Sequence, residues 1–202
     1  MIDHLVYATN DLPKSAAILE QALGATLTVG GRHPNRGTLN YLLKIGPATY
    51  LELLAIDPEN TTAPPPRWMG IDLLPPNTTG RLTRWARAVT DGIDEKQLAN
   101  IDFEAGSRRT TDGHLLEWRL SNPGSTPLIS AAPFYIDWLG KPSPAERLPE
   151  SGCRLTRFII CGPTAPTTIF TDEKEFLTLH PNHTPARLEA TIVGPAGTVI
   201  LV

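Results

Sequence analysis

The distribution of apolar residues over the first 56 positions predicts a compact unit of strands around one helix. Two largely apolar segments, IDHLVYAT at 2–9 and TYLELLAID at 49–57, are typical of buried strands. Between them lie a helical segment and a glycine-rich turn that leads into a further strand. The predicted order is strand, helix and three strands, which is one βαβββ module over residues 1–56.

Residues typical of helix ends stand at both ends of the predicted helix. Asp11 can accept hydrogen bonds from first-turn amides, Pro13 suits a first turn, and Gly24 can adopt the left-handed conformation that ends a helix. Four apolar residues recur at helical spacing: Leu12, Ala16, Leu19 and Leu23. They share one face, so the pattern predicts an amphipathic helix packed on a sheet.

The two strands each carry one polar residue among apolar neighbours. Because side chains alternate along a strand, His4 shares a face with Ile2 and Val6, and Glu52 shares one with Tyr50. Burying an imidazole or a carboxylate without a partner is costly. We therefore expect His4 and Glu52 to lie within hydrogen-bond or metal-ligand distance of each other in one apolar-walled cup.

The segment GGRHPNRGTLN at 30–40 concentrates hydrogen-bonding groups in a short span. Its glycines allow close backbone approach, and its polar side chains can contact an anionic or carbonyl compound. Those side chains are Arg32, His33, Arg36, Thr38 and Asn40. The sequence predicts a turn at the mouth of the cup, with a role in substrate binding or only as a solvated connection.

The rest of the chain repeats parts of the first unit. Residues 57–80 form a proline-rich connection that either covers an exposed sheet end, the favoured interpretation, or forms a lid. Residues 81–138 form a second, degenerate βαβββ module, because an offset of 81 aligns the segments that follow His4 and Trp85.

At this offset Trp85 replaces His4, and Ile136 replaces Glu52 unless a one-residue slip brings in Asp137. Residues 139–152 are a linker. Residues 153–202 form a strand-rich partial module, because RLTRF at 154–158 repeats RLTRW at 81–85.

The segments IDHLVYATNDL, GGRHPNRGTLN and YLELLAID resemble the glyoxalase-like branch of the vicinal oxygen chelate superfamily. The resemblance is close over residues 1–56 and continues loosely through DGHLLEWRL and APFYIDW to about residue 138. It implies an α+β fold in which paired βαβββ modules form a cup-shaped mixed sheet. It also implies a divalent metal in the cup.

On this resemblance the chain is a small-molecule enzyme with metal-assisted lyase, isomerase or dioxygenase chemistry on a carbonyl or diol substrate. His4 and Glu52 are the expected ligands of zinc, iron, manganese or nickel. Glu52 and His33 are the expected catalytic groups. The expected substrate contacts are Arg32, Arg36, Thr38, Asn40, Tyr50 and Trp118, the last as a cup wall.

A metal-free binding or sequestration protein is the alternative, because the second module lacks convincing ligands. The net charge of −3 and a pI of about 5.9 exclude the basic surface expected of a nucleic-acid partner. Without an apolar segment long enough to span a membrane or a leader, the sequence predicts a cytoplasmic protein. Its oligomeric state is not decided, and a homodimer is one arrangement that it allows.

Overall fold

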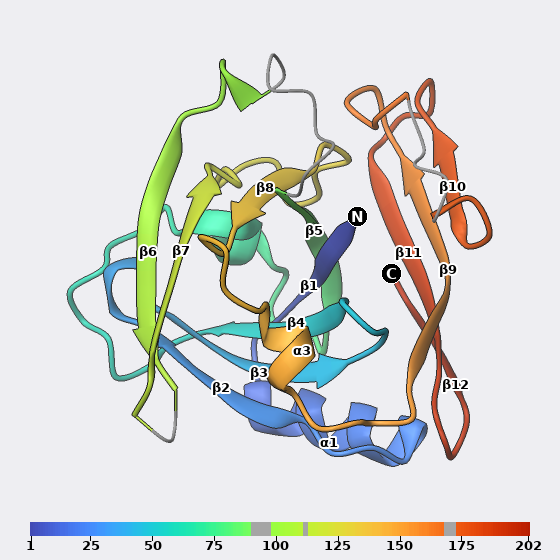
Figure 1. The fold of residues 1–202 in the computed structure, drawn as a ribbon, viewed down its shortest axis with the longest axis horizontal. Coiled ribbons are helices and arrows are strands. Elements are labelled where there is room, and N and C mark those ends of the chain that lie inside the picture. The colour runs from blue at the N-terminus through green and yellow to red at the C-terminus, as the bar shows by residue number, and fades with distance from the viewer. Residues whose placement is uncertain (90–97, 111–112, 168–172) are drawn as a thin grey trace.

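The strands of the chain form two separate sheets (Figure 1). The computed structural model describes residues 1–89, 98–110, 113–167 and 173–202. The strands of the large sheet are β1 (Ile2–Thr9), β2 (Thr28–His33), β3 (Thr38–Lys44), β4 (Tyr50–Ile56), β5 (Arg81–Ala88), β6 (Phe103–Arg109), β7 (Leu115–Ser121) and β8 (Phe134–Asp137). The smaller sheet holds β9 (Arg154–Cys161), β10 (Leu177–His180), β11 (Arg187–Val193) and β12 (Thr198–Leu201).

The large sheet consists of two halves with the same topology. Its order is β2-β3-β4-β1-β5-β8-β7-β6, so each half runs outward from the central β1 and β5 pair in the same sequence of strands. In each half the first strand pairs in parallel with the fourth, and the remaining pairs are antiparallel. This confirms the paired βαβββ fold. The predicted helix of the second module falls mostly on residues 90–97, outside the described residues.

The sheet curls until its edge strands β2 and β6 contact each other. The concave side, which we call the cup face, carries His4 of β1 and Glu52 of β4. The prediction of one long turn over 30–40 is wrong in detail. Most of that segment belongs to β2 and β3, joined by the short 3-10 helix η1 (Pro34–Arg36), and Gly37 with φ of 63° completes the turn.

The register between the halves corrects the predicted alignment. On the central antiparallel pair His4 lies opposite Ala86, whereas Trp85 lies opposite Leu5. Opposed residues share a sheet face, so Trp85 points away from the cup and does not replace His4. The reason is the twofold period of a strand, in which an offset of 81 instead of 82 moves every side chain to the other face.

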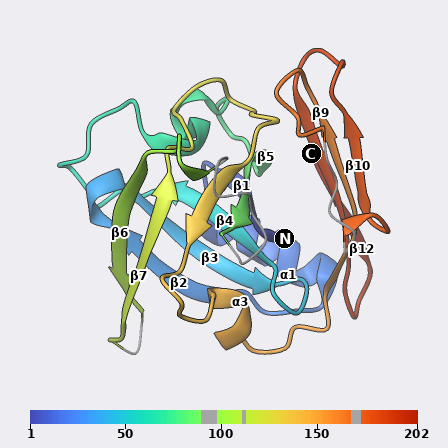
Figure 2. The same cartoon turned by 45° about the horizontal axis from the view of Figure 1, so that its top comes forward.

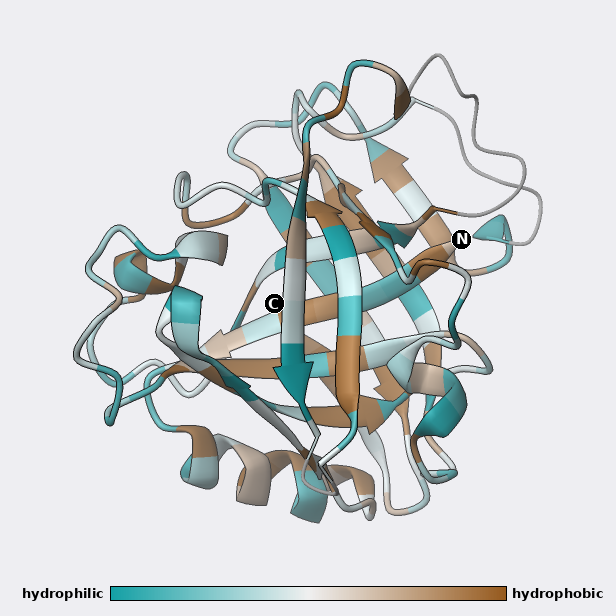
Figure 3. Ribbon diagram, turned by 60° about the vertical axis from the view of Figure 1, so that its left-hand side comes forward, coloured by the Kyte–Doolittle hydropathy of each residue, from teal (hydrophilic) through white to brown (hydrophobic). Residues whose placement is uncertain are grey.

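The helix α1 (Leu12–Leu23) covers the outer face of the first half, as the sequence predicts. The Asp11 side chain accepts a hydrogen bond from the Lys14 amide at 3.0 Å, and Gly24 ends the helix with φ of 69°. Its buried side chains are Leu12, Ser15, Ala16, Leu19 and Leu23. Figure 3 shows both hydrophobic and hydrophilic positions along this helix, as expected of a surface helix on a sheet.

The smaller sheet packs on the outer side of the large one, on the opposite side of β1 and β5 from β7 and β8 (Figures 1 and 2). Phe158 of β9 contacts Trp85 edge to face with ring centroids 5.8 Å apart, and the Leu82 amide donates to the Val202 carbonyl at 2.9 Å. Cys153 and Cys161 are both buried free thiols. The short helix α3 (Pro144–Arg147) lies in the linker before this sheet.

The proline-rich connection forms a second 3-10 segment, η2 (Trp68–Leu73), that closes one end of the cup. Trp68 and Met69 are buried in the same apolar cluster as Trp118 and Trp138. The Met69 amide donates to the Gly124 carbonyl at 2.7 Å, which fixes the connection to the second half. No helix among the described residues is long and apolar enough to cross a membrane.

Candidate functional site

His4 and Glu52 lie side by side on the cup face. On the parallel pair of β1 and β4, His4 aligns with Tyr50 and Val6 with Glu52, which brings the two polar side chains to neighbouring positions. His4 Nε2 lies 3.8 Å from Glu52 Oε2, and both side chains are buried. This separation exceeds a direct hydrogen bond, and one further atom can lie within hydrogen-bond distance of both.

Hydrogen bonds hold each of these two groups from its other side. His4 Nδ1 lies 2.6 Å from Asp3 Oδ1, and Trp138 Nε1 donates to Asp3 Oδ2 at 2.8 Å. Asn40 Nδ2 donates to Glu52 Oε1 at 2.5 Å. The contacts fix the ring of His4 and the plane of Glu52, so that Nε2 and Oε2 face each other.

Aromatic rings surround the imidazole of His4. Tyr50 stacks on it with ring centroids 4.7 Å apart and an interplanar angle of 22°, and Phe134 of the second half contacts it edge to face at 5.3 Å. Burial raises the pKa of Tyr50 well above its ordinary value, and the carboxylates of Asp3 and Glu52 add to this effect. Tyr50 is therefore a neutral phenol at physiological pH.

These residues line a small space of about 30 Å³, which we call the inner chamber. Its lining residues are His4, His33, Asn40, Tyr50, Glu52, Trp68, Met69, Arg108, Trp118, Leu120, Phe134, Ile136 and Trp138. A space of this size admits one or two water molecules or a small chemical group. The polar groups come mainly from the first half, and the walls come mainly from the second half and the connection.

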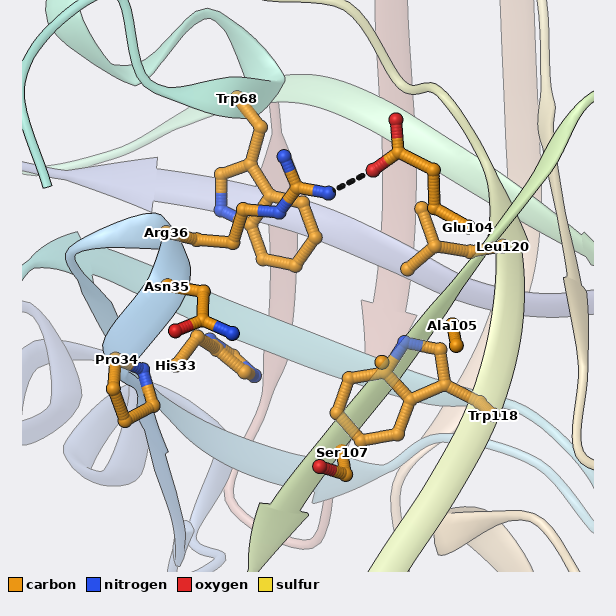
Figure 4. Close-up of a pocket in the computed structure, with 11 residues that line it drawn as sticks. His33, Pro34, Asn35, Arg36, Trp68, Glu104, Ala105, Ser107, Trp118 and Leu120 are labelled. Carbon is orange, nitrogen blue, oxygen red and sulfur yellow. Dashed lines mark hydrogen bonds and ion pairs between the residues drawn. The ribbon is translucent and has the colours of Figure 1, made fainter.

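A larger pocket of about 210 Å³, the outer pocket, adjoins the inner chamber (Figure 4). Trp68 and Trp118 face it from opposite sides and also line the inner chamber. The guanidinium of Arg36 lies 5.1 Å from the Trp68 ring centroid and forms an ion pair with Glu104 of β6. This ion pair joins the η1 turn to the second half across the mouth of the pocket.

His33 stands between the two spaces. Its ring contacts Trp68 and Trp118 edge to face at centroid distances of 5.4 and 6.2 Å, and its Nδ1 lies 3.1 Å from Thr38 Oγ1. Thr38 Oγ1 also accepts a hydrogen bond from Trp68 Nε1 at 3.1 Å. Desolvation by burial lowers the pKa of His33 to about 4, so the ring is neutral at physiological pH.

The structure does not bring Arg32 into either space. Its guanidinium donates to Asp57 at 2.7 Å and pairs with Glu59 at 2.8 Å, and these hydrogen bonds raise the pKa of Arg32. Arg32 borders instead a groove of about 720 Å³ along the line where β2 and β6 meet. Thr38 lies behind the wall, where it positions His33 and Trp68.

Four residues around the two spaces were not anticipated from the sequence: Asp3, Trp68, Arg108 and Trp138. Asp3 precedes the histidine on a strand, and alternation assigns it to the opposite face. Trp68 lies within the 57–80 connection and Trp138 directly follows β8, and periodicity carries no information at either place. Arg108 is a charged residue on a largely exposed strand, typical of a solvated position.

The second half does not supply metal ligands at the positions equivalent to His4 and Glu52. The registers equate the pair His4 and Tyr50 with the pair Ala86 and Phe134, and consequently Glu52 with Ile136. Ile136 lies on the cup face, while Asp137 pairs with Arg119 outside it. Among the described residues, no three histidine, cysteine, aspartate or glutamate side chains gather closely enough to hold a metal ion.

The sequence matches the family described as "Glyoxalase-like domain" over residues 2–171, and the chain belongs to this family. The resemblance inferred from the sequence is thereby confirmed. A comparison with curated proteins found no match to this chain.

Several solved structures are similar to this chain. A hypothetical protein from Staphylococcus aureus has 16% identity and a TM-score of 0.59, over 99% of this chain and 84% of that one. The methylmalonyl-CoA epimerase of Streptomyces coelicolor has 18% identity and a TM-score of 0.47, over 71% and 98%. The methylmalonyl-CoA epimerase of Mycobacterium tuberculosis has 18% identity and a TM-score of 0.43, over 67% and 85%. At 16% identity, the first of these similarities shows a shared fold and nothing about function.

Proposed function

We propose that this chain is a small-molecule enzyme that moves a proton within a carbonyl compound, with the reacting atoms in the inner chamber. The observation that carries the proposal is the buried array in which Asp3 holds His4, Asn40 holds Glu52, and the free edges of His4 and Glu52 face each other at 3.8 Å. Buried groups fixed in this way are typical of acid–base sites.

In the proposed reaction Glu52 is the base and His4 is the hydrogen-bond donor. The donor is the His4 imidazolium, whose Nδ1–H group is held by Asp3. Glu52 Oε2 removes a proton from the carbon next to the carbonyl group, and His4 Nε2 gives its proton to the carbonyl oxygen, so that an enol forms. A C–H and an N–H bond break, and one O–H bond forms on Glu52 and one on the enol.

In the second step the enol returns its proton to His4 and Glu52 returns its proton to the opposite face of the carbon, which gives an epimer. Where that carbon carries a hydroxyl group, the hydroxyl can instead give its proton to His4 while Glu52 protonates the former carbonyl carbon, which gives an isomer. No group is oxidised or reduced overall.

The remaining predicted contacts divide into two groups. Asn40, Tyr50 and Trp118 line the inner chamber, and Arg36 lies at the mouth of the outer pocket, so these four are the proposed substrate contacts. We assign the neutral ring of His33 to the wall between the two spaces, where it can donate or accept one hydrogen bond.

A divalent metal held by His4 and Glu52 stays a prediction. The Asp3–His4 contact is the arrangement that orients metal-binding histidines, and it favours this idea. A chain-held ion nevertheless needs about three protein ligands, and the equivalent positions are Ala86 and Ile136. The donor set as a whole does not fit such an ion, and no step above depends on one.

A binding or sequestration protein is the second candidate. The outer pocket of about 210 Å³, with Trp68 and Trp118 on opposite sides, favours it because a concave space with aromatic walls suits a small ligand. In this case the outer pocket binds the ligand and His4 and Glu52 contribute only stability.

Hydrogen–deuterium exchange separates the two candidates. Phenylpyruvate and a panel of other small carbonyl compounds are incubated with the protein in D₂O, and NMR records the loss of the signal from the C–H next to the carbonyl group. We expect Glu52→Gln to slow this exchange about 100-fold or more, and the matched control Glu59→Gln, at the exposed Arg32 pair, to leave it unchanged. Binding without exchange supports the second candidate instead.

The same preparation decides the metal question. Protein purified without a chelating tag is assayed for zinc, iron, manganese and nickel, and His4→Ala is assayed in parallel. A stoichiometric ion that is lost in His4→Ala would establish the metal site, and exchange by metal-free protein would support the proposed mechanism.

A further inference from the structure

Arg108 of β6 is a cation in the cup that the proposed reaction does not use. Its side chain is 7% exposed, and it borders the inner chamber together with the groove between β2 and β6. Desolvation lowers the pKa of Arg108, yet a guanidinium remains charged at physiological pH. A buried charge needs either a partner in the protein or a ligand that supplies one.

The protein satisfies only part of the hydrogen-bonding capacity of the Arg108 guanidinium. Arg108 Nη1 donates a hydrogen bond to the backbone carbonyl of Gly30 across the line where β2 and β6 meet. In the described part of the chain no carboxylate lies within ion-pair distance of Arg108, although the nearby Glu52 stabilises its charge. The planar guanidinium has five N–H groups, which leaves donors for an anion.

Two further buried polar atoms, on residues that line the inner chamber, have no hydrogen-bond partner among the described residues. Trp118 Nε1 is a donor, and Asn40 Oδ1 is an acceptor because its amide nitrogen is committed to Glu52. Unpaired buried polar atoms are rare in folded proteins, and a ligand or water is the usual explanation. A carboxylate can accept hydrogen bonds from Trp118 and Arg108, and a hydroxyl or enol group can donate to Asn40.

The outer pocket fixes the rest of the ligand. Its volume of about 210 Å³ is close to that of cavities of roughly 150 Å³ that bind benzene. Trp118 faces the pocket from one side and Trp68, with the Arg36 guanidinium over its ring, from the other (Figure 4). A single aromatic ring can pack between the indole of Trp118 and the planar guanidinium.

We propose that the cup selects a small aromatic acid, with its ring between Trp118 and the Arg36 guanidinium and its carboxylate bound by Arg108. The proposal rests on the same site as the proposed function, but it depends on binding and not on proton transfer. In this proposal the second half of the large sheet, through Arg108 and Trp118, selects the substrate.

The test compares acids with their neutral amides. Benzoate and benzamide, and phenylacetate and phenylacetamide, are titrated into the full chain and followed by NMR chemical shifts. We expect the acid of each pair to bind about tenfold or more tightly than the amide, the range for a hydrogen-bonded charge pair. Equal affinities for acid and amide overturn the proposal. So does the absence of binding by both acids at concentrations up to about 10 mM, because a specific pocket binds its ligand more tightly than this.

Three variants locate the preference. Arg108→Met should abolish it, Arg108→Lys should keep part of it because the charge remains, and Arg119→Met should keep it in full because Arg119 is exposed and pairs with Asp137 outside the cup. Thermal unfolding of each variant checks that the fold persists. A preference that persists in Arg108→Met overturns the assignment. Binding of acids without hydrogen–deuterium exchange refutes the proposed reaction and leaves the present proposal intact.

Discussion

The two halves of the large sheet have one topology and two chemistries. The first half places His4 and Glu52 on the cup face, whereas the equivalent places in the second half hold Ala86 and Ile136. The second half contributes aromatic walls and one cation, Arg108. The comparison shows that two halves with the same strand pairing can carry different side chains at matching places on the cup face.

The largest effect on stability is expected from a substitution of Arg84, a buried residue of β5 in the second half. Its guanidinium donates to five backbone carbonyls of residues 83 and 123–128 and has no carboxylate partner in the described chain. Burial lowers the pKa of Arg84 to about 10. The carbonyls of Thr83 and Gly124 also accept from the amides of Ser130 and Met69. Arg84→Met removes the Arg84 donor from the carbonyls of Pro123, Pro127 and Leu128 and should lower the free energy of unfolding by about 3 to 5 kcal/mol.

Chemical denaturation measures this change, and the chain provides a matched control. Arg157 occupies the same place in the repeated RLTR segment but is exposed on β9. Arg157→Met should change the free energy of unfolding by less than about 0.5 kcal/mol. Similar losses for the two variants would show that the carbonyl contacts of Arg84 contribute little.

A second substitution restores a polar residue where the second half has lost one. Ile136→Glu introduces a carboxylate into the apolar wall and should lower the free energy of unfolding at pH 7 by about 3 to 4 kcal/mol. Burial raises the pKa of the new group above its unfolded value, so the cost is present above that value and disappears as the pH falls below about 4. Ile136→Gln lacks this pH dependence.

The same variant tests whether one added carboxylate beside His4 and Glu52 is enough to create a metal site. Ile136 and Glu52 line one chamber with His4, so Ile136→Glu completes a set of three candidate ligands. Zinc at about 100 times its dissociation constant should then recover about 2.7 kcal/mol. An equal rise in the unfolding temperature of wild-type protein with zinc would contradict the view that the second half limits metal binding.

A third prediction uses the neutral histidine of the first half. The pKa of His33 is about 4 in the folded chain against an unfolded value of 6.5. The unfolded state therefore binds more protons between these values, and the free energy of unfolding falls as the pH drops from about 6.5 to 4, by about 3 kcal/mol at the lower end. His33→Gln should remove this part of the pH profile. His183→Gln, on an exposed loop, should not.

The helix and strands of the first half could be predicted from the sequence, because periodicity and helix caps are local signals. The strand with His4, the helix capped by Asp11 and Gly24, and the strand with Glu52 were all readable from alternation and helical spacing. The alignment of the two halves failed by one residue at Trp85, because weak similarity does not fix the face of a strand. Only the hydrogen-bonded register opposite His4 does so.

The site was predictable where a polar residue stands among apolar neighbours and not elsewhere. His4 and Glu52 carried that signal, whereas Asp3 should face outward by alternation and instead contacts His4. Trp68 and Arg108 reach the cup from a proline-rich connection and an edge strand. Their places depend on the curl of the whole sheet, which brings β2 to β6, and no local pattern encodes that curl.

The smallest expected effect compares the two tryptophans of the outer pocket, one from each side of the cup. Trp68 Nε1 donates to Thr38 Oγ1 at 3.1 Å, whereas Trp118 Nε1 is buried without a partner in the described residues. Substitution by phenylalanine removes the same atoms from each ring, so the difference between the two variants reports mainly on the N–H group. Trp68→Phe should lower the free energy of unfolding by about 1 kcal/mol more than Trp118→Phe.

Ligand binding should reverse this order. If Trp118 Nε1 donates to the carboxylate of an aromatic acid, Trp118→Phe weakens benzoate binding while it changes the stability of the free protein little. Trp68→Phe, whose N–H group is directed to Thr38, should then affect benzoate less. Equal losses of stability in the two variants would show that Trp118 Nε1 already has a hydrogen-bond partner in the free protein, and the ligand would gain nothing from that donor.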